Sequence, residues 1–216
     1  MRILLINQFY KPDTAATGQL LADVAEELAA KGHEVHIICG RTIYNGGRHS
    51  APKEQIEAGI HIHRVACTSF GRHKLIGRAT DYLSFYITAA RRALKLPRPD
   101  VCVSLTTPPL ISLVGLMLSS LKGTKSVIWV MDVYPEIAVA YDVLQKRSLL
   151  YRILTRVNRI LYRNAAAVIS LGEMMTEQLK SVGAGPDNIY TVHNWVPGET
   201  VGWLDRIPVG RWDLLH

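Results

Sequence analysis

The sequence predicts a doubly wound α/β domain with a mainly parallel, Rossmann-like sheet. Short apolar runs of strand length alternate with segments of helical periodicity along nearly the whole chain. With 216 residues, 48% of them hydrophobic, the chain can bury one substantial core. The pattern weakens after Pro197, so we expect one domain over residues 1–197 and a linker or the stump of a second domain over 198–216.

Seven short apolar runs are expected to form strands, because each resembles a strand buried on both faces of a parallel sheet. They lie at residues 2–7, 34–39, 59–65, 101–105, 126–131, 166–170 and 188–192. Residues 40–56 contain Gly46, Gly47 and Pro52 without periodicity, which indicates a mobile surface loop.

Five segments with apolar residues three and four positions apart are expected to form helices. They lie at residues 17–31, 75–96, 109–121, 149–163 and 173–182. Gly32 suits a left-handed cap after the first helix, and Pro97 and Pro99 end the second.

Several classes of protein are disfavoured by missing patterns. The loop after the first strand lacks G-x-G-x-x-G, which argues against a nicotinamide or flavin dehydrogenase, and no P-loop is present. No D-x-D occurs, and His61-x-His63 offers two imidazoles without a third ligand, so we expect no metal and no cofactor.

The stretch 108–121 is too short to span a bilayer, and MRILLINQF is typical of a first strand rather than a signal peptide. Three cysteines without C-x-x-C spacing fit a reducing compartment.

The net charge of +7 is concentrated in two stretches. Residues 64–98 hold eight Lys or Arg against Asp81 alone, and residues 146–163 hold six against no acid. Nucleic acid, an anionic membrane surface, a phosphorylated substrate or ordinary solvated helix faces would each account for this charge.

Both basic stretches belong to expected helices. Four arginines spaced 4, 3 and 4 apart follow one face of helix 149–163: Arg152, Arg156, Arg159 and Arg163. The opposite stripe is Leu150, Ile153, Leu154, Val157 and Leu161, so the arginines form either a solvated face or a surface for anionic lipid headgroups. The cations Arg72, Lys74 and Arg78 at the start of helix 75–96 oppose the helix dipole, which favours a role toward a partner.

Ligands of doubly wound domains bind outside the carboxyl ends of the strands, which directs attention to the loop 8–18. The helix start after this loop could bind an anion, and Gly18 would permit its close approach. Alternatively, Thr17 is an N-cap and Gly18 merely suits the helix start.

The segment Trp129-Val-Met-Asp132-Val-Tyr134-Pro135-Glu136 ends an apolar strand at a carboxylate, and Pro135 prevents the strand from continuing. Asp132 is therefore held where it could orient or deprotonate a substrate hydroxyl. Alternatively, Asp132 and Glu136 are turn and helix-start residues.

Five segments taken together resemble the amino-terminal half of retaining GT-B glycosyltransferases of the glycosyl-transfer family 4 type, nearest to the WbuB-like subgroup. They are MRILLINQFYKPDTAATGQLLADVAEELAAKGHEV, RPDVCVSLTTPPL, VIWVMDVYPE, AAAVISLGEMM and IYTVHNW. The resemblance implies a two-domain enzyme in which this Rossmann-like domain handles the acceptor. The Glu-x7-Glu motif and most nucleotide contacts of such families belong to a second domain, and nothing after His193 supplies them here.

By this resemblance, Gly18, with Thr17, corresponds to the glycine whose amide faces the donor diphosphate, and Asp132 to a residue that contacts the reacting sugar or acceptor. Thr107 and Tyr134 lie in neighbouring cleft loops, and we expect Glu136 to bind substrate with them. His193 and Asn194 are expected at the entrance to the interdomain hinge. The family chemistry is front-face transfer, which needs no protein nucleophile.

We therefore expect the acceptor-binding half of a glycosyltransferase for polysaccharide or cell-envelope biosynthesis, inactive alone and independent of metal. Its expected partners are a nucleotide-sugar donor, a lipid-linked or saccharide acceptor and an anionic membrane, without nucleic acid. We expect the protein to be cytoplasmic and peripherally bound to the inner membrane. An inverting GT-B transferase and a non-catalytic peripheral membrane or interaction module are the alternatives.

Overall fold

The computed structural model describes residues 1–41, 51–68 and 75–195. Within them the strands are β1 (Arg2–Ile6), β2 (Glu34–Gly40), β3 (Glu54–Glu57), β4 (Ile60–Val65), β5 (Val101–Leu105), β6 (Lys125–Trp129), β7 (Ala167–Ser170) and β8 (Ile189–Thr191). The helices are α1 (Ala16–Ala30), α2 (Leu75–Lys95), α3 (Ser112–Lys122), α4 (Glu136–Ala140), α5 (Leu149–Asn164) and α6 (Glu173–Val182).

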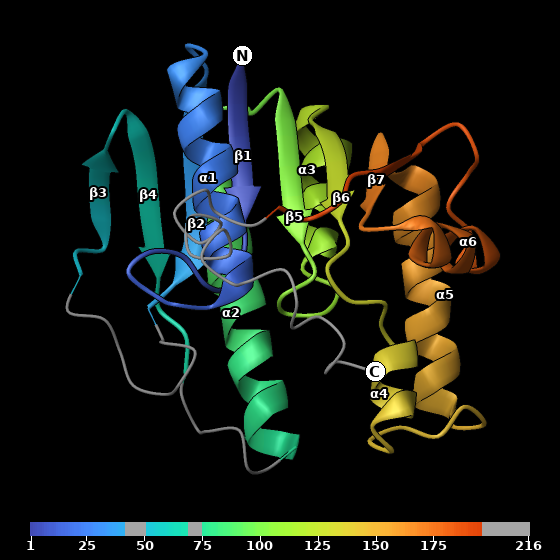
Figure 1. Cartoon of the computed structure of the whole chain (residues 1–216). Helices are drawn as coiled ribbons and strands as arrows, with labels where there is room; N and C mark the ends of the chain where they lie inside the picture. Colours follow the sequence, from blue (N-terminus) through green and yellow to red (C-terminus); the bar gives the residue numbers. More distant parts are fainter. Residues whose placement is uncertain (42–50, 69–74, 196–216) are drawn as a thin grey trace, which may run out of the picture.

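All eight strands belong to one sheet in the order β3-β4-β2-β1-β5-β6-β7-β8 (Figure 1). Every neighbouring pair is parallel except β3 and β4, which are antiparallel. The predicted doubly wound, mainly parallel architecture is thereby confirmed.

The core lies on both faces of this sheet. On one face Leu21 of α1 packs with Leu5 of β1 and Ile37 of β2. On the other, Phe85 of α2 and Leu118 of α3 pack against neighbouring residues of β1, β2 and β5. Farther along this second face, α5 and α6 cover β6 and β7. Because both faces are covered, the central strands contain almost only apolar residues.

Two elements were missed by the sequence prediction. Residues 54–56 were expected to belong to a loop, but together with Glu57 they form β3, which pairs with β4 through a two-residue turn. Ala58 and Gly59 both have positive φ, the conformation that a tight hairpin turn of this kind requires. The second missed element is α4, a short helix directly after Pro135. The remainder of the expected loop, residues 42–50, and the expected linker, 198–216, lie outside the described residues.

The histidines of β2 and β4 have structural contacts. His63 is buried, and its Nε2 lies 3.0 Å from Nδ1 of His36, while its Nδ1 pairs with the Glu54 carboxylate. His61 stacks on the His36 ring at a centroid distance of 4.7 Å. Glu54 also accepts a hydrogen bond from Arg92 of α2. The histidines therefore join β2, β3 and β4 to α2.

Two further features bear on the predictions from the sequence, namely membrane-spanning segments and the state of the three cysteines. None of the helices in the described segments is long and apolar enough to cross a membrane. Cys39, Cys67 and Cys102 are free and buried.

Candidate active site

The carboxyl ends of β1, β5, β6 and β7 form one rim of the sheet. The chain proceeds from β1 to β2 on one side, and β5 pairs with β1 on the other, so the direction of strand succession reverses between β1 and β5. Such a switch point is where doubly wound domains bind ligands. The predicted site residues Thr107, Asp132 and Tyr134 lie in the loops after β5 and β6, and Thr17 and Gly18 lie in the first turn of α1, after the loop that follows β1.

The loop between β1 and α1 is held together by side chains. Asn7 is completely buried, and its Nδ2 donates to the Phe9 carbonyl at 2.8 Å and to Oγ1 of Thr17 at 3.3 Å. The carboxylate of Asp13 accepts the backbone N–H of Ala15 at 2.9 Å. Thr17 was considered as an N-cap, but it lies inside α1, whose N-cap is Ala15, and no side chain in the described part of the chain caps the helix start.

Gly18 lies against the backbone of the same loop. A Cβ at this position would be 3.2 Å from the carbonyl carbon and oxygen of Phe9. The Gly18 N–H donates to the Ala15 carbonyl at 2.9 Å. The absence of a side chain therefore allows α1 to approach the loop closely.

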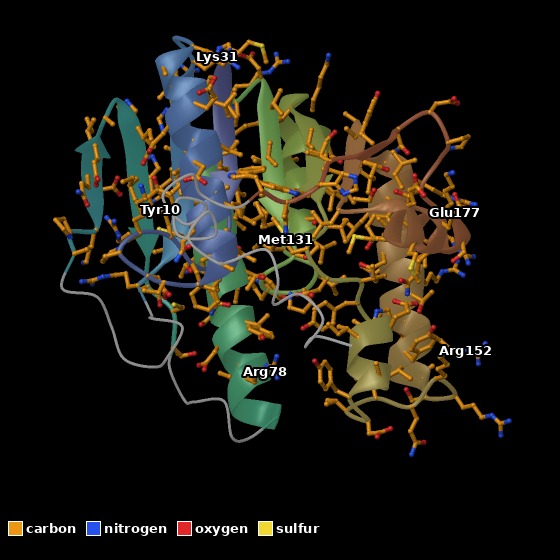
Figure 2. The ribbon with its side chains drawn as sticks, in the orientation of Figure 1. Tyr10, Lys31, Arg78, Met131, Arg152 and Glu177 are labelled. Atoms are coloured by element: carbon orange, nitrogen blue, oxygen red, sulfur yellow. The ribbon has the colours of Figure 1, made fainter. Side chains whose placement is uncertain are left out.

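Asp132 follows β6 and is anchored through its backbone. The N–H groups of Met131 and Asp132 donate to Oγ1 of the buried Thr106 at 3.0 and 3.1 Å. Figure 2 labels Met131 near the centre of this rim. The neighbouring Thr107 was predicted as a site residue, and it contributes its carbonyl, which accepts the N–H of Gln8 at 2.9 Å. Thr106 was missed by the sequence prediction, although strand alternation could have indicated it, since it shares a face with Ser104.

A small pocket opens beside Asp132 between the end of β6 and α5. Thr106, Asp132 and Tyr134 line it from the strand ends, and Asn158, Leu161 and Tyr162 line it from α5. The Asn158 side chain donates to the Tyr134 carbonyl, which fixes the loop against α5. Gly18 lies at the same rim of the sheet but does not line this pocket.

The pocket environment disfavours ionisation of its acidic groups. Partial burial raises the pKa of the Asp132 carboxyl group. The pKa of Tyr134 is raised by burial first, then by the nearby Tyr82 and Asp132, and is lowered less strongly by Arg78. A carboxylate with a raised pKa is a better proton acceptor for a hydroxyl group than one in water.

Glu136 begins α4 and lies toward α5, outside the lining of the pocket. Its Oε1 accepts a hydrogen bond from the Tyr151 hydroxyl at 3.3 Å. Its Oε2 is buried and has no hydrogen-bond partner within the described residues. Glu136 is thus close to the Asp132 loop and is positioned by α5.

His193 and Asn194 follow β8 and are exposed. His193 Nδ1 lies 2.9 Å from the Leu171 carbonyl at the end of β7. Trp195, which was not predicted, then stacks on Trp129 at a centroid distance of 5.8 Å and donates its Nε1–H to Asp23 of α1 at 2.8 Å. The chain after β8 therefore returns along the rim from β7 to α1.

The predicted membrane-facing residues fall into two groups. Arg72 and Lys74 lie outside the described residues, and Arg78 at the start of α2 is exposed and donates from Nε to the Tyr82 hydroxyl at 3.0 Å. The four arginines of α5 are exposed, and Arg159 donates to the Val182 carbonyl at 3.1 Å. Leu150 and Ile153 were placed on the stripe opposite the arginines, but both are exposed.

The mainly parallel, doubly wound sheet matches the fold of GT-B glycosyltransferases. The chain matches the model of the glycosyl transferase 4-like domain over residues 16–195, and it belongs to that family. A probable glycosyltransferase of Pseudomonas aeruginosa, WbjE, is 29% identical over 133 residues, which are 60% of this chain and 33% of that protein.

Solved structures with the same fold have low sequence identity. Sucrose-phosphate synthase from Thermosynechococcus elongatus has a TM-score of 0.64 and 15% identity, over 96% of this chain and 53% of that chain. WaaG, a glycosyltransferase involved in lipopolysaccharide biosynthesis, has a TM-score of 0.56 and 14% identity, over 94% and 50%. Anabaena HepE in complex with UDP and glucose has a TM-score of 0.54 and 15% identity, over 91% and 45%. The chain thus spans about a third of WbjE and about half of these structures.

Proposed function

We propose that this chain is the acceptor-binding half of a retaining glycosyltransferase of the WbuB-like subgroup. The enzyme would transfer a sugar from a nucleotide-sugar to an acceptor that is either a polysaccharide or linked to a membrane lipid. The observation that carries the proposal is the half-buried carboxylate of Asp132 at the carboxyl end of β6, beside a pocket. Membership of the glycosyl transferase 4-like family supports the reaction class.

The proposed role of Asp132 is to orient the acceptor hydroxyl. Thr106 holds the Asp132 backbone from the neighbouring strand end, so the carboxylate is presented from a rigid part of the sheet. In front-face transfer the acceptor oxygen bonds to the anomeric carbon as the bond from that carbon to the phosphate oxygen breaks. The leaving phosphate takes the acceptor proton, and Tyr134 and Glu136 are proposed to contact the acceptor near this point.

The donor is proposed to lie across the rim, between this domain and a carboxyl-terminal domain that grips the nucleotide. Its diphosphate would lie at the start of α1 beside Thr17 and Gly18, where the helix dipole favours negative charge, although the Gly18 N–H itself is bonded to Ala15. The structure of HepE in complex with UDP and glucose supports a nucleotide-sugar as donor. His193 and Asn194 are proposed to lead into the hinge.

We further propose that residues 1–216 have little transfer activity alone, because a donor held from one side is not kept in attack geometry. The test measures transfer of labelled sugar from nucleotide-sugars to bacterial lipid extracts, with the chain alone and joined to a carboxyl-terminal nucleotide-sugar-binding domain. Activity is expected only in the second case and should fall at least about tenfold in Asp132→Asn. The control is Asp187→Asn, which removes an exposed carboxylate from the turn before β8.

The outcomes separate this proposal from its alternatives. An unchanged rate in Asp132→Asn would reject the role of Asp132, and robust turnover by residues 1–216 would reject their inactivity alone. The anomeric configuration of the product distinguishes a retaining from an inverting enzyme. Absence of transfer in every arm would favour a peripheral membrane or interaction module.

A lipid-linked acceptor would place the protein in the cytoplasm, peripheral on the inner membrane. WaaG, which shares the fold, is involved in lipopolysaccharide biosynthesis, and this supports a cell-envelope acceptor. The arginines of α5 and Arg78 are the described residues proposed to face the membrane.

A further inference from the structure

The outer face of α5 exposes large apolar side chains. Leu149 is 71% exposed, Leu150 54%, Ile153 49% and Ile160 47%. The opposite side of the helix buries Leu161 and its neighbours against α6 and the sheet. Apolar residues scattered singly on a surface are normal, but four on the exposed side of one helix form an apolar strip that favours a partner.

Arginines lie directly beside this strip. With 3.6 residues per turn, Leu149, Ile153 and Ile160 form one row along the helix, and Arg152, Arg156 and Arg163 form the adjacent row. Helix α5 contains no Asp or Glu. Within the described residues these three arginines form no ion pair with a carboxylate. Their positive charge is therefore not neutralised locally.

The turn between α4 and α5 exposes further apolar and basic side chains. Tyr141 is 76% exposed, Val143 is also exposed, and Lys146 and Arg147 follow. Figure 1 shows that α4 and the start of α5 extend beyond the carboxyl ends of β5 and β6. Figure 2 shows Arg152 on the side of α5 that is turned away from the sheet. This surface therefore lies at the same end of the molecule as the Asp132 pocket.

The combination of charge and apolar area selects among partners. A solvated helix face usually alternates acids and bases, and a nucleic acid surface does not require exposed leucines. A helix that lies in a bilayer interface has apolar residues on one side and arginines beside them, which contact acyl chains and anionic headgroups respectively.

We propose that the α5 docking face, formed by Tyr141, Val143, Leu149, Leu150, Ile153 and Ile160 with Arg152, Arg156 and Arg163, inserts its apolar side chains into an anionic bilayer. The proposal deepens the proposed function, on which it rests, by naming the contact that brings the Asp132 pocket to a membrane-anchored acceptor. It goes beyond a purely electrostatic attraction, because the apolar strip must leave water.

Vesicle flotation of the full chain tests the two components separately. The protein is mixed with vesicles of phosphatidylcholine alone or with added phosphatidylglycerol. Arg152→Gln with Arg156→Gln should weaken binding to anionic vesicles roughly fivefold per arginine at low salt. Leu149→Asn with Ile153→Asn should weaken it on the order of tenfold and remove the part that resists high salt. Leu121→Asn, at the exposed carboxyl end of α3, is the matched control and should bind like the parent.

A second measurement detects insertion directly. In Tyr141→Trp, the new indole should shift its emission to shorter wavelength with anionic vesicles and be quenched by brominated acyl chains, relative to the parent protein. Binding that is lost entirely at high salt, without quenching, would overturn insertion in favour of surface attraction. Equal, negligible flotation with both kinds of vesicle would overturn the proposal. The exposed side of α5 would then bind an acidic protein partner or would simply be solvated. Neither readout depends on sugar transfer, so failure here is distinguishable from failure of the proposed function.

Discussion

The side-chain oxygen of Thr106 accepts the backbone N–H of Asp132 at 3.1 Å, and so joins the loops after β5 and β6. The same oxygen accepts the Met131 N–H. Two backbone donors at the rim thus depend on one buried hydroxyl group. The position of the candidate catalytic carboxylate is therefore set by a residue of the neighbouring strand end.

Removal of this hydroxyl group should destabilise the domain. Thr106→Val keeps the shape but leaves two backbone N–H groups unpaired, which we expect to cost about 2 kcal/mol. Thr106→Ser keeps the oxygen and should cost less than half of that. Urea denaturation monitored by circular dichroism measures the free energy of unfolding of both variants. Equal losses of this free energy in Thr106→Val and Thr106→Ser would contradict the role of the hydroxyl group.

Asp132 should lower stability near neutral pH. Its pKa in the folded protein is raised by burial, so the folded state holds its proton to higher pH than the unfolded state. The stability contributed by this group is complete below its ordinary pKa of about 3.9 and is lost as pH rises through the folded value. We therefore expect Asp132→Asn to be more stable than the parent at pH 7 and similar to it at pH 3. Thermal melts of both proteins over this pH range measure the difference. An Asp132→Asn variant that is less stable than the parent at pH 7 would contradict the expectation.

Gly18→Ala should destabilise the domain because its Cβ would meet the Phe9 carbonyl group at 3.2 Å. Overpacking of this kind costs roughly 1–3 kcal/mol. Gly172→Ala is the matched control, since nothing lies within 4 Å of its Cβ position. A denaturation midpoint for Gly18→Ala that equals the control would show that the loop adjusts freely.

The hydrogen bond from Trp195 to Asp23 should hold the segment after β8 on α1. Trp195→Phe retains an aromatic ring over Trp129 but loses the donor, and we expect a loss of about 1 kcal/mol. Asp23→Ala should cost a similar amount, and the double variant should cost no more than either alone. Additive losses would indicate that the two side chains contribute independently.

His63 should make stability fall in mild acid. Burial is the largest effect and lowers its pKa, Arg92 lowers it further, and the Glu54 hydrogen bond partly opposes this. The unfolded state therefore takes up a proton first, so stability is complete above the ordinary pKa of about 6.5 and declines as pH falls below it toward the folded value. The decline between pH 7 and 5 should be smaller in His63→Asn. His33→Asn, in the turn before β2, is the control and should keep the parent slope.

Local pattern predicted most of the strands and helices. The seven expected strands are present, and Asp132 was placed at the end of β6 because an apolar run stops there before Pro135. The hairpin strand β3 was missed, since its four residues have no periodicity of their own and are a strand only through pairing with β4. The exposure of Leu150 and Ile153 was also missed, because it depends on how α5 lies over β6 and β7.

The sequence by itself determined the alternation of strands and helices, the parallel sheet and the carboxylate at its rim, since these follow from the periodicity of adjacent residues. Only the tertiary structure decided that Thr106, rather than Thr107, holds the Asp132 backbone, and that Trp195 reaches Asp23. Those contacts join residues far apart in the chain, and their geometry depends on the register of the strands and the packing of the helices between them.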